Sequence, residues 1–399
     1  MIETIRVKTD PNVIWVQVHT DTGLVGLGET YHAPTAVQAA VHDYFGPLLI
    51  GRDPFAVERH WLDMFALSEW SGYGGAEMRA ISALDMALWD IKGQAVDLPI
   101  YELLGGAVRS SIRVYATAMP NEGADVVAKQ LLDQGITAIK GNTTDAFAIA
   151  TDGQFLSSAD LDRSLRPVRE IRDAVGLEME IANDNHSLWN LPIAIRIAQA
   201  MEDYEIMWQE DLLQVLRPEA LRELQDATRT PVCVSERVLG RWQYAQYIEG
   251  RATRIVMPDL VWTGGISETN KIATLASVHQ LPVAPHDATG PVSIFASAHI
   301  CMNAPTAMIQ EFVPEYVDGW YAEFVDPNLD IRDGHLHAPR RPGIGTRLRP
   351  EVRDRPDATV ITSDEPGMNM TEMWDPDPDR PPALEAEVQR RRRERGPQP

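Results

Sequence analysis

The segment Glu178–Asp184, which reads EMEIAND, is a short apolar run that closes on an acid, and the chain repeats this arrangement three more times. The other runs are IMWQE at 206–210, PVCVSE at 231–236 and RIVMPD at 254–259. Helix-patterned sequence follows each run, and the first three closing acids, Asp184, Glu210 and Glu236, are evenly spaced. Strands that alternate with helices favour parallel β-structure, and the length of the repeating region favours a closed (β/α)8 barrel in an α/β fold.

Four further strand-like segments bring the predicted barrel to eight strands: 113–118, 138–142, 282–287 and 308–312. The catalytic groups of such barrels lie at the C-terminal ends of the strands, which is where the acids fall. Three carboxylates that converge from adjacent strands offer the hard oxygen ligands that suit Mg²⁺ far better than Zn²⁺. Any one of these acids, taken alone, could instead be a helix N-cap or a surface charge.

Two strand ends predict a general base. His286 ends the seventh strand and Asp259 ends the sixth, so the two side chains are expected to be neighbours. A carboxylate that holds one imidazole nitrogen fixes the tautomer and raises the basicity of the other nitrogen. We therefore predict that His286 and Asp259 form the base.

His186 follows Asp184 by two residues, so strand alternation would point both side chains to the same face. A neutral imidazole is a poor ligand for a Mg²⁺ that already has three carboxylates, which favours His186 as a general acid over a metal ligand. It could also do no more than hydrogen-bond the substrate.

A base across from a divalent metal is the arrangement for removing a proton α to a carboxylate. Lys140 could add positive charge at the carboxylate oxygen, but Asn142 cannot take a proton, which argues against a two-base racemase. We expect His286 to take the C2 proton and His186 to protonate a leaving 3-hydroxyl. The resulting enol would ketonise to a 2-keto-3-deoxy acid. Glu311 would hydrogen-bond the substrate opposite the metal, unless it is only a charge at the barrel rim.

At these residues the chain resembles the enolase superfamily, within it the mandelate racemase group, and most closely the galactonate-type sugar-acid dehydratases. The resemblance covers about residues 1–348. It is carried by Met86-Ala87-Leu88-Trp89-Asp90-Ile91-Lys92-Gly93, Arg113-Val114-Tyr115, Lys140-x-Asn142, Asp184-x-His186, Glu210, Ser235-Glu236-Arg237, Pro258-Asp259 with Gly264-Gly265, Pro285-His286, Gln310-Glu311 and Pro342-Gly343-Ile344-Gly345. It implies that Asp184, Glu210 and Glu236 bind Mg²⁺.

The chain departs from the family pattern in three places. The fourth strand ends Glu210-Asp211-Leu212, where the family commonly has a second Glu and a Pro. His286 is followed by Asp287, an acid unusual for that loop, and the connection 145–160 is longer than the plain pattern. These departures bear on the identity of the substrate.

Four regions are predicted along the chain. Residues 1–112 show alternating segments followed by helical patterns, an α+β unit that the resemblance identifies as a capping domain. The barrel occupies 113–325, and 326–360 would return to the cap. Residues 361–399 are rich in Asp, Glu, Pro and Arg and are expected to be mostly disordered, with one short helix over 383–393.

Two segments of the cap are expected to close over the substrate: the loop 29–34 and the glycine-rich loop 71–75. Both could instead be ordinary surface turns. The expected substrate contacts are Lys140, Asn142, Arg237, Glu29 and Tyr73.

Composition excludes several classes of protein. A formal charge of −22 disfavours nucleic acid, whose phosphates need Lys and Arg clusters. No apolar run approaches the roughly 20 residues of a membrane span, and the N-terminus lacks signal-peptide features, so we expect a cytoplasmic protein without a membrane partner. Cys233 and Cys301 are expected to be buried and unpaired. A homo-oligomer is expected.

The leading hypothesis is Mg²⁺-dependent dehydration of an aldonic acid such as galactonate. Epimerisation or lactone cycloisomerisation would use the same enolate chemistry without loss of water. A mannonate or gluconate dehydratase is a nearer alternative, although the loop 143–161 lacks the Tyr and Arg expected of the mannonate type. A catalytically silent binding protein on the same scaffold is a further alternative.

Overall fold

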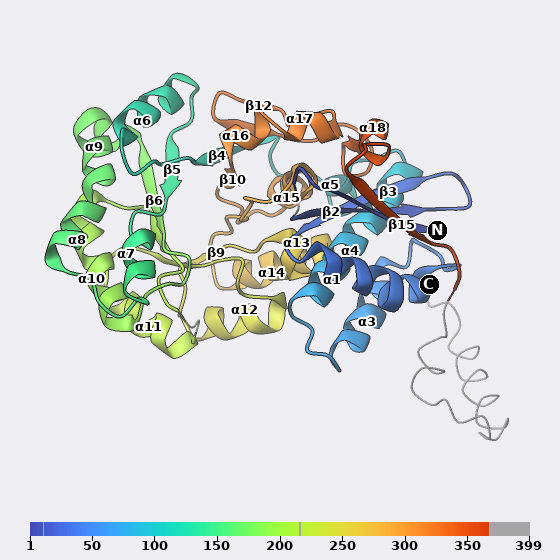
Figure 1. The fold of residues 1–399 in the computed structure, drawn as a ribbon, viewed down its shortest axis with the longest axis horizontal. Coiled ribbons are helices and arrows are strands. Elements are labelled where there is room, and N and C mark those ends of the chain that lie inside the picture. Colours follow the sequence, from blue (N-terminus) through green and yellow to red (C-terminus); the bar gives the residue numbers. More distant parts are fainter. Residues whose placement is uncertain (11, 215–216, 367–399) are drawn as a thin grey trace.

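The protein has two parts, a barrel and a cap that covers one side of it (Figure 1). The computed structural model describes residues 1–10, 12–214 and 217–366. The predicted tail helix over 383–393 lies outside the described residues, as does nearly all of the predicted tail.

The barrel is a ring of parallel strands in chain order. Its strands are β4 Ser111–Thr117, β5 Ala138–Gly141, β6 Glu180–Asp184, β7 Trp208–Glu210, β8 Val232–Val234, β9 Ile255–Val256 and β10 Gln310–Phe312. β10 pairs with β4 in parallel, which joins the last strand to the first. The predicted (β/α)8 architecture is therefore confirmed.

The seventh strand differs from the prediction. Over 282–287 the chain makes only single parallel bridges, from Val283 to Val256 and to Ala307. Pro282 and Pro285 have no N–H to donate to a ladder, which limits regular pairing on both sides of Val283. The bridges still close the gap between β9 and β10.

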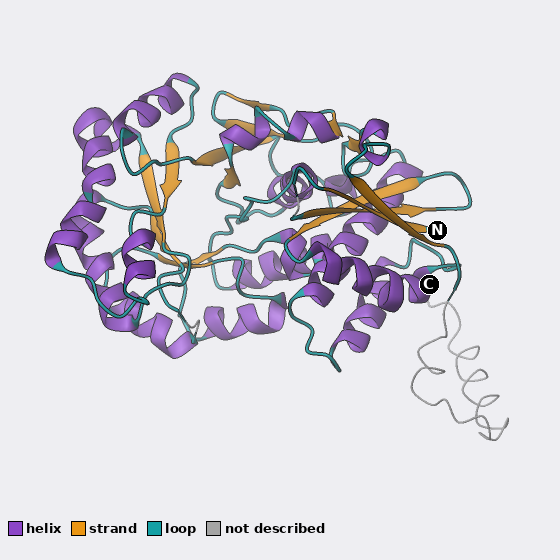
Figure 2. Ribbon diagram, in the orientation of Figure 1, coloured by secondary structure: helices purple, strands orange, loops and turns teal. Residues whose placement is uncertain are grey.

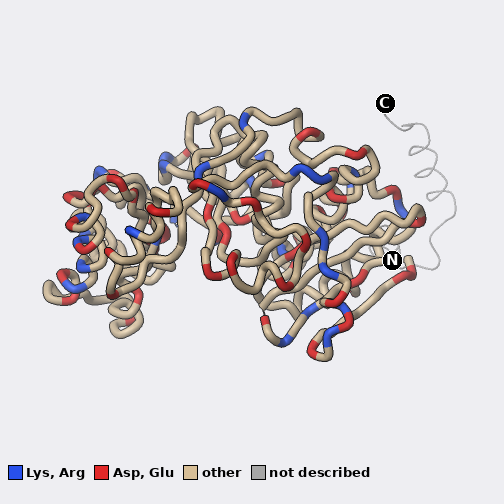
Figure 3. Tube along the Cα trace, turned by 90° about the horizontal axis from the view of Figure 1, so that it is seen from above, with Lys and Arg blue, Asp and Glu red and all other residues tan. Residues whose placement is uncertain are grey.

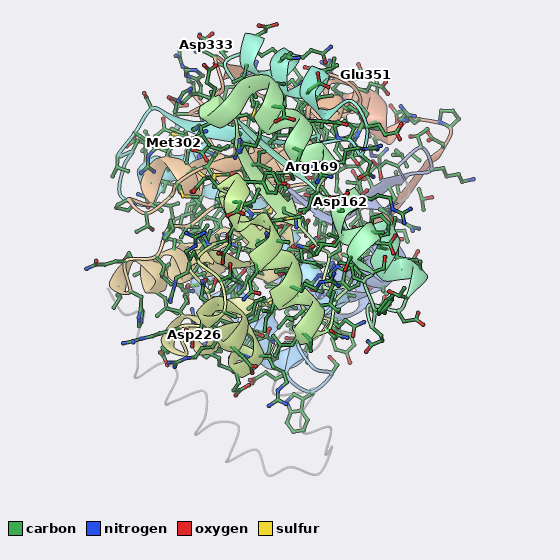
Figure 4. All side chains as sticks on the ribbon, turned by 90° about the vertical axis from the view of Figure 1, so that its left-hand side faces the viewer. Asp162, Arg169, Asp226, Met302, Asp333 and Glu351 are labelled. Atoms are coloured by element: carbon green, nitrogen blue, oxygen red, sulfur yellow. The ribbon has the colours of Figure 1, made fainter. Side chains whose placement is uncertain are left out.

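Helices cover the outside of the ring (Figure 2). Besides α13 Leu260–Thr263, which lies between the ring and the cap, the helices around the ring are α6 Ala124–Asp133, α7 Asp145–Ala150, α8 Ser158–Ser164, α9 Arg166–Val175, α10 Leu191–Met201, α11 Pro218–Asp226, α12 Gly240–Glu249, α14 Gly265–Val278 and α15 Pro291–Asn303. Helices such as α6, α8 and α9 carry both acidic and basic residues, and both charges appear along this part of the trace in Figure 3. Arg169, for example, pairs with Asp162 at 2.6 Å on the surface seen in Figure 4.

A small buried cluster fills the interior of the ring. Tyr115 and Trp208 meet edge to face at 5.1 Å between ring centroids, and Cys233 lies in the same cluster. Cys233 and Cys301 are both buried and free, as the sequence predicted. The indole N–H of Trp208 also donates a hydrogen bond to Glu210 at 2.9 Å, so this interior cluster contacts one of the strand-end acids.

The cap combines a four-stranded antiparallel sheet with helices. The sheet order is β15 Ala358–Ser363, β1 Ile2–Val7, β2 Val13–His19 and β3 Val25–Tyr31. The helices are α1 Pro34–Ala39, a π-helix over Ala40–Phe45, α2 Gly46–Leu49, α3 Val57–Ser68, α4 Ala76–Ala95 and α5 Ile100–Leu103. β15 completes the sheet beside β1, so the predicted boundary at 360/361 falls inside a strand.

The returning segment packs on the barrel before it reaches the cap. α16 Pro314–Val317 and α17 Tyr321–Phe324 follow β10, and the returning segment then continues through β11 Val325–Asp326, β12 Ile331–Arg332, β13 His335–His337, β14 Arg347–Leu348 and α18 Pro350–Arg353. β13 pairs antiparallel with the start of β4.

Helix α4 joins the two parts through buried polar contacts. Asp85 accepts hydrogen bonds from the backbone and side chain of Ser267. Asp90 accepts from the backbone N–H of Leu27 in the cap and of Ile344 in the returning segment. The motif that contains Asp90 therefore ties three segments together. No helix in the described part of the chain is long and apolar enough to cross a membrane.

Candidate active site

The predicted acids gather at the C-terminal ends of the barrel strands. Asp184 ends β6 and lies in register with Glu210, which ends β7. Glu236 lies two residues beyond β8. Burial raises the pKa of Glu210 to about 8, with Lys140 opposing the rise and Asp184 adding to it.

Lys140, at the end of β5, is the cation within this group. Its Nζ lies 2.8 Å from both Glu210 Oε1 and Glu311 Oε1, and 3.7 Å from Asp184 Oδ2. Thr117 donates to the same Glu311 oxygen, and the backbone N–H of Asp287 donates to the other. Glu311 is therefore buried and fully engaged with protein groups, so direct substrate contact by Glu311 stays a prediction.

Glu236 is surrounded by polar partners of its own. Ser235 donates to Glu236 and lies 2.6 Å from Asp211. Arg237 Nε lies 3.2 Å from Asp211 and 3.7 Å from Glu236. Burial and the charge of Glu236 raise the pKa of Asp211 to about 7. The predicted substrate residue Arg237 thus sits at the site, next to the acid that departs from the family pattern.

His286 and Asp259 form the predicted pair. His286 Nδ1 lies 2.7 Å from Asp259 Oδ2, while the other Asp259 oxygen accepts the N–H of Val261. His286 Nε2 faces Glu236 and Glu311, each at 3.9 Å. Burial would lower the pKa of His286, but these two carboxylates outweigh it and raise the pKa well above its usual value.

His186 reaches the site for a different reason from the one the sequence suggested. β6 ends at Asp184, and His186 has a left-handed backbone with φ 45°, so strand alternation does not orient it. Its Nε2 nevertheless lies 3.3 Å from Asp184 Oδ2. Its Nδ1 lies 2.5 Å from Asp145 Oδ2, an acid that the sequence reasoning did not select. The hydrogen bond with Asp145 raises the pKa of His186 to about 9.

The predicted metal ligands fit a divalent cation in chemistry and charge. They are carboxylates at neighbouring strand ends, so negative charge is concentrated there. The charges of Asp184 and Glu236 add to the rise in the pKa of Glu210. That charge also raises the pKa of His286, and a divalent cation would offset this effect. As the side chains stand, however, no three His, Cys, Asp or Glu residues of the described chain are grouped closely enough to hold a metal. In the present arrangement these carboxylates contact Lys140, Ser235 and His186.

Glu29 and Tyr73, which were predicted to lie in loops that close over the substrate, instead contact both the cap and the barrel. Glu29 lies within β3 and is fully buried, with its oxygens accepting from Trp15 Nε1 and the N–H of Ser293. Tyr73 packs its ring on Phe65 of the cap and accepts from Gln243 of the barrel at 3.3 Å. Strand β3 continues through Glu29 to Tyr31, so the first residues of the predicted loop 29–34 belong to a strand. Both residues join cap to barrel in the present arrangement.

Asn142, the remaining predicted substrate contact, is exposed and donates to Asp145 at 3.1 Å.

Two residues of the cap, Arg79 and His32, also reach the site, and the sequence did not predict this. The Arg79 guanidinium lies 4.5 Å from the centroid of Trp262, whose ring is 5.8 Å from that of His286. His32, in the predicted loop 29–34, lies on Trp262 at 5.4 Å. Arg79 belongs to α4, whose helical pattern gave no sign that this residue faces another domain.

Comparison with known proteins agrees with this architecture. Residues 3–105 match the family model described as mandelate racemase / muconate lactonizing enzyme, N-terminal domain, and 124–352 match the enolase C-terminal domain-like model. An enolase of the mandelate racemase subgroup from Agrobacterium tumefaciens is 39% identical, with a TM-score of 0.87 over 92% of this chain and 99% of that one.

Relatives named as dehydratases match most of the chain. D-galactonate dehydratase of Variovorax paradoxus is 32% identical over 88% of this chain and 92% of the relative. D-xylonate dehydratase of Haloferax volcanii is 30% identical over 85% of this chain and 84% of the relative. The chain belongs to the enolase superfamily, in its mandelate racemase and muconate lactonizing enzyme group, among dehydratases.

Proposed function

We propose that this enzyme dehydrates a sugar acid of the aldonic type, such as galactonate, to its 2-keto-3-deoxy acid. The observation that carries the proposal is that two histidines each lie beside one of the three strand-end carboxylates predicted to bind the metal. His286 Nε2 lies 3.9 Å from Glu236, and His186 Nε2 lies 3.3 Å from Asp184. The names of the galactonate and xylonate dehydratases support the reaction class.

The two histidines would divide the proton transfers between them. His286 Nε2 takes the C2 proton, while Asp259 holds Nδ1–H and so keeps the accepting nitrogen turned toward the substrate. His186 gives a proton to the 3-hydroxyl as the C3–O bond breaks, and water leaves. The C2–C3 enol that remains takes up a proton at C3 and becomes the keto acid, so the net change is the loss of one water.

Asp184, Glu210 and Glu236 are the residues that we propose to hold Mg²⁺. When bound, the ion supplies positive charge beside the substrate carboxylate, which lowers the cost of removing a weakly acidic C2 proton. Lys140 contacts Glu210 and Glu311, and its positive charge offsets part of the negative charge of these acids.

The test is a screen of stereochemically complete aldonic acids with Mg²⁺, read out as the semicarbazone of the 2-keto acid. We expect one or a few related acids to give keto acid at a rate that falls when the metal is chelated. Inversion at C2 without keto acid would favour an epimerase instead. Failure of the whole library to react would contradict the proposal.

A further inference from the structure

We propose that Asp145 is a positioning residue that completes a second aspartate–histidine pair, in which His186 is the proton donor. This inference rests on the proposed function, because it concerns the step in which the 3-hydroxyl leaves. The sequence gives no pattern that singles out Asp145, which lies in the connection after β5.

The two pairs have the same form. Asp145 Oδ2 lies 2.5 Å from Nδ1 of His186, and Asp259 Oδ2 lies 2.7 Å from Nδ1 of His286. In both pairs the aspartate contacts Nδ1 of the imidazole. Nε2 then faces a strand-end carboxylate, which is Asp184 for His186 and Glu236 for His286. Each imidazole thus presents the same nitrogen to the centre of the site.

The loop that carries Asp145 is fastened to the segment that carries His186. Thr143 donates to Asn183 at 3.2 Å, and Thr144 donates to Asn185 at 2.8 Å. Asp145, the next residue, reaches His186, the residue after Asn185. Three consecutive side chains therefore bind to the end of β6 and to the turn that follows it, so the contact between Asp145 and His186 is one of a series of contacts between the two segments.

The backbone of this turn is held in an uncommon conformation. His186 and Ser187 have φ of 45° and 58°, in the left-handed region that residues other than glycine rarely occupy. Such conformations persist where the surroundings impose them, and they occur often at functional sites. Asn142 also donates to Asp145 Oδ2 at 3.1 Å, which fixes the carboxylate that the imidazole meets.

A simpler role for Asp145 would be that of an acid in the first turn of α7, where the helix dipole favours negative charge. The chain offers a direct comparison in Asp125, in the first turn of α6, which pairs with Lys129 on the surface at 3.0 Å. The carboxylate of Asp145 instead meets a histidine that borders the site.

Asp145 would act by fixing which proton His186 can give away. With Nδ1–H held by the carboxylate, the transferable proton is the one on Nε2. After its transfer to the leaving hydroxyl, the neutral ring keeps Nδ1–H and its bond to Asp145. Asp145 itself neither gains nor loses a proton, as in the aspartate of a serine protease triad.

The test measures two reactions of the same substrate: dehydration, and exchange of the C2 hydrogen with deuterated solvent. Asp145→Ala is expected to lower the rate of dehydration by about 100-fold while exchange stays within about threefold, because removal of the C2 proton does not involve His186. In a His186→Asn background, Asp145→Ala should change neither the residual dehydration nor the retained C2 exchange, since the two residues act as a unit. The control Asp125→Ala should change neither rate.

The outcomes separate this inference from the proposed function. Equal loss of exchange and dehydration in Asp145→Ala, or additive loss with His186→Asn, would show that Asp145 supports the loop only. If the wild-type enzyme dehydrates no acid sugar, the proposed function fails, and nitrogen NMR of the histidine rings decides the pairing by itself. A hydrogen-bonded Nδ1 proton on His186 that disappears in Asp145→Ala would support the pair, and a neutral ring that is protonated on Nε2 but not on Nδ1 in both proteins would exclude it.

Discussion

Lys140 Nζ lies 2.8 Å from Glu210 Oε1, with both side chains almost completely buried. Removing one member of such a pair leaves a charge buried without compensation, which typically costs about 3–5 kcal/mol. We therefore expect Lys140→Met to be strongly destabilised without metal and to recover more of its melting temperature on addition of Mg²⁺ than the wild type does. Lys271→Met, which breaks a partly exposed contact with Glu58, is the control and should change stability by about 1 kcal/mol or less. An equal Mg²⁺ response in Lys140→Met and wild type would argue against a cation site at Glu210.

Glu236→Gln should abolish turnover and weaken Mg²⁺ binding, since one of three carboxylate ligands loses its charge. Calorimetric titration with Mg²⁺ and circular dichroism would separate loss of metal from loss of fold. Near-normal dehydration in metal-depleted buffer would contradict the role of all three acids.

Replacement of the histidines should have unequal effects. His286→Asn is expected to stop both C2 exchange and dehydration, whereas His186→Asn should stop dehydration and retain exchange. Asp259→Asn should slow exchange by about 10²- to 10⁴-fold by permitting the wrong tautomer of His286, without loss of Mg²⁺ binding. Proton NMR in deuterated solvent measures exchange directly. Exchange that survives in His286→Asn but not in His186→Asn would reverse the two assignments.

The buried acid Glu29 should make stability depend on pH. Burial raises its pKa from 4.5 to about 8, so the folded protein keeps a proton that the unfolded chain releases. This contribution to stability is complete below the unfolded pKa and is lost as the pH rises toward the folded value. Glu29→Gln cannot ionise, so its stability relative to wild type should increase between about pH 5 and pH 8, by at most about 1.4 kcal/mol per pH unit. Denaturant unfolding at several pH values would measure this, and parallel curves for the two proteins would contradict the buried, protonated state.

Gly93 lies where helix α4 meets the returning segment. A Cβ at this position would be 2.5 Å from Gly343 Cα, so backbone would have to move. Gly93→Ala is expected to cost about 1–3 kcal/mol, despite the better helix propensity of alanine. In Gly74→Ala the new Cβ would be 3.6 Å from Leu239, an ordinary contact, and the melting temperature should hardly change. A stabilised Gly93→Ala would mean that α4 and the returning segment are not in close contact.

Much of the barrel could be predicted because its information is local. Runs such as EMEIAND encode a strand and its end within a few residues, and parallel strands bring their C-terminal ends to one side. This is why Asp259 could be assigned to His286 from the sequence: adjacent strands in chain order are adjacent in space. The seventh strand is less regular than predicted because Pro282 and Pro285 have no N–H to donate on either side of Val283.

The sequence by itself determined the order of the strands, the acids at their ends and one histidine pair, since these follow from a repeat that the backbone imposes. Only the tertiary structure decided that Asp145 meets His186, that Arg79 of the cap reaches Trp262, and that Glu29 is buried against Ser293. These contacts join loops or separate domains, where residue spacing along the chain sets no distance in space. The path of each loop, fixed by side-chain hydrogen bonds and left-handed turns, determines which groups meet there.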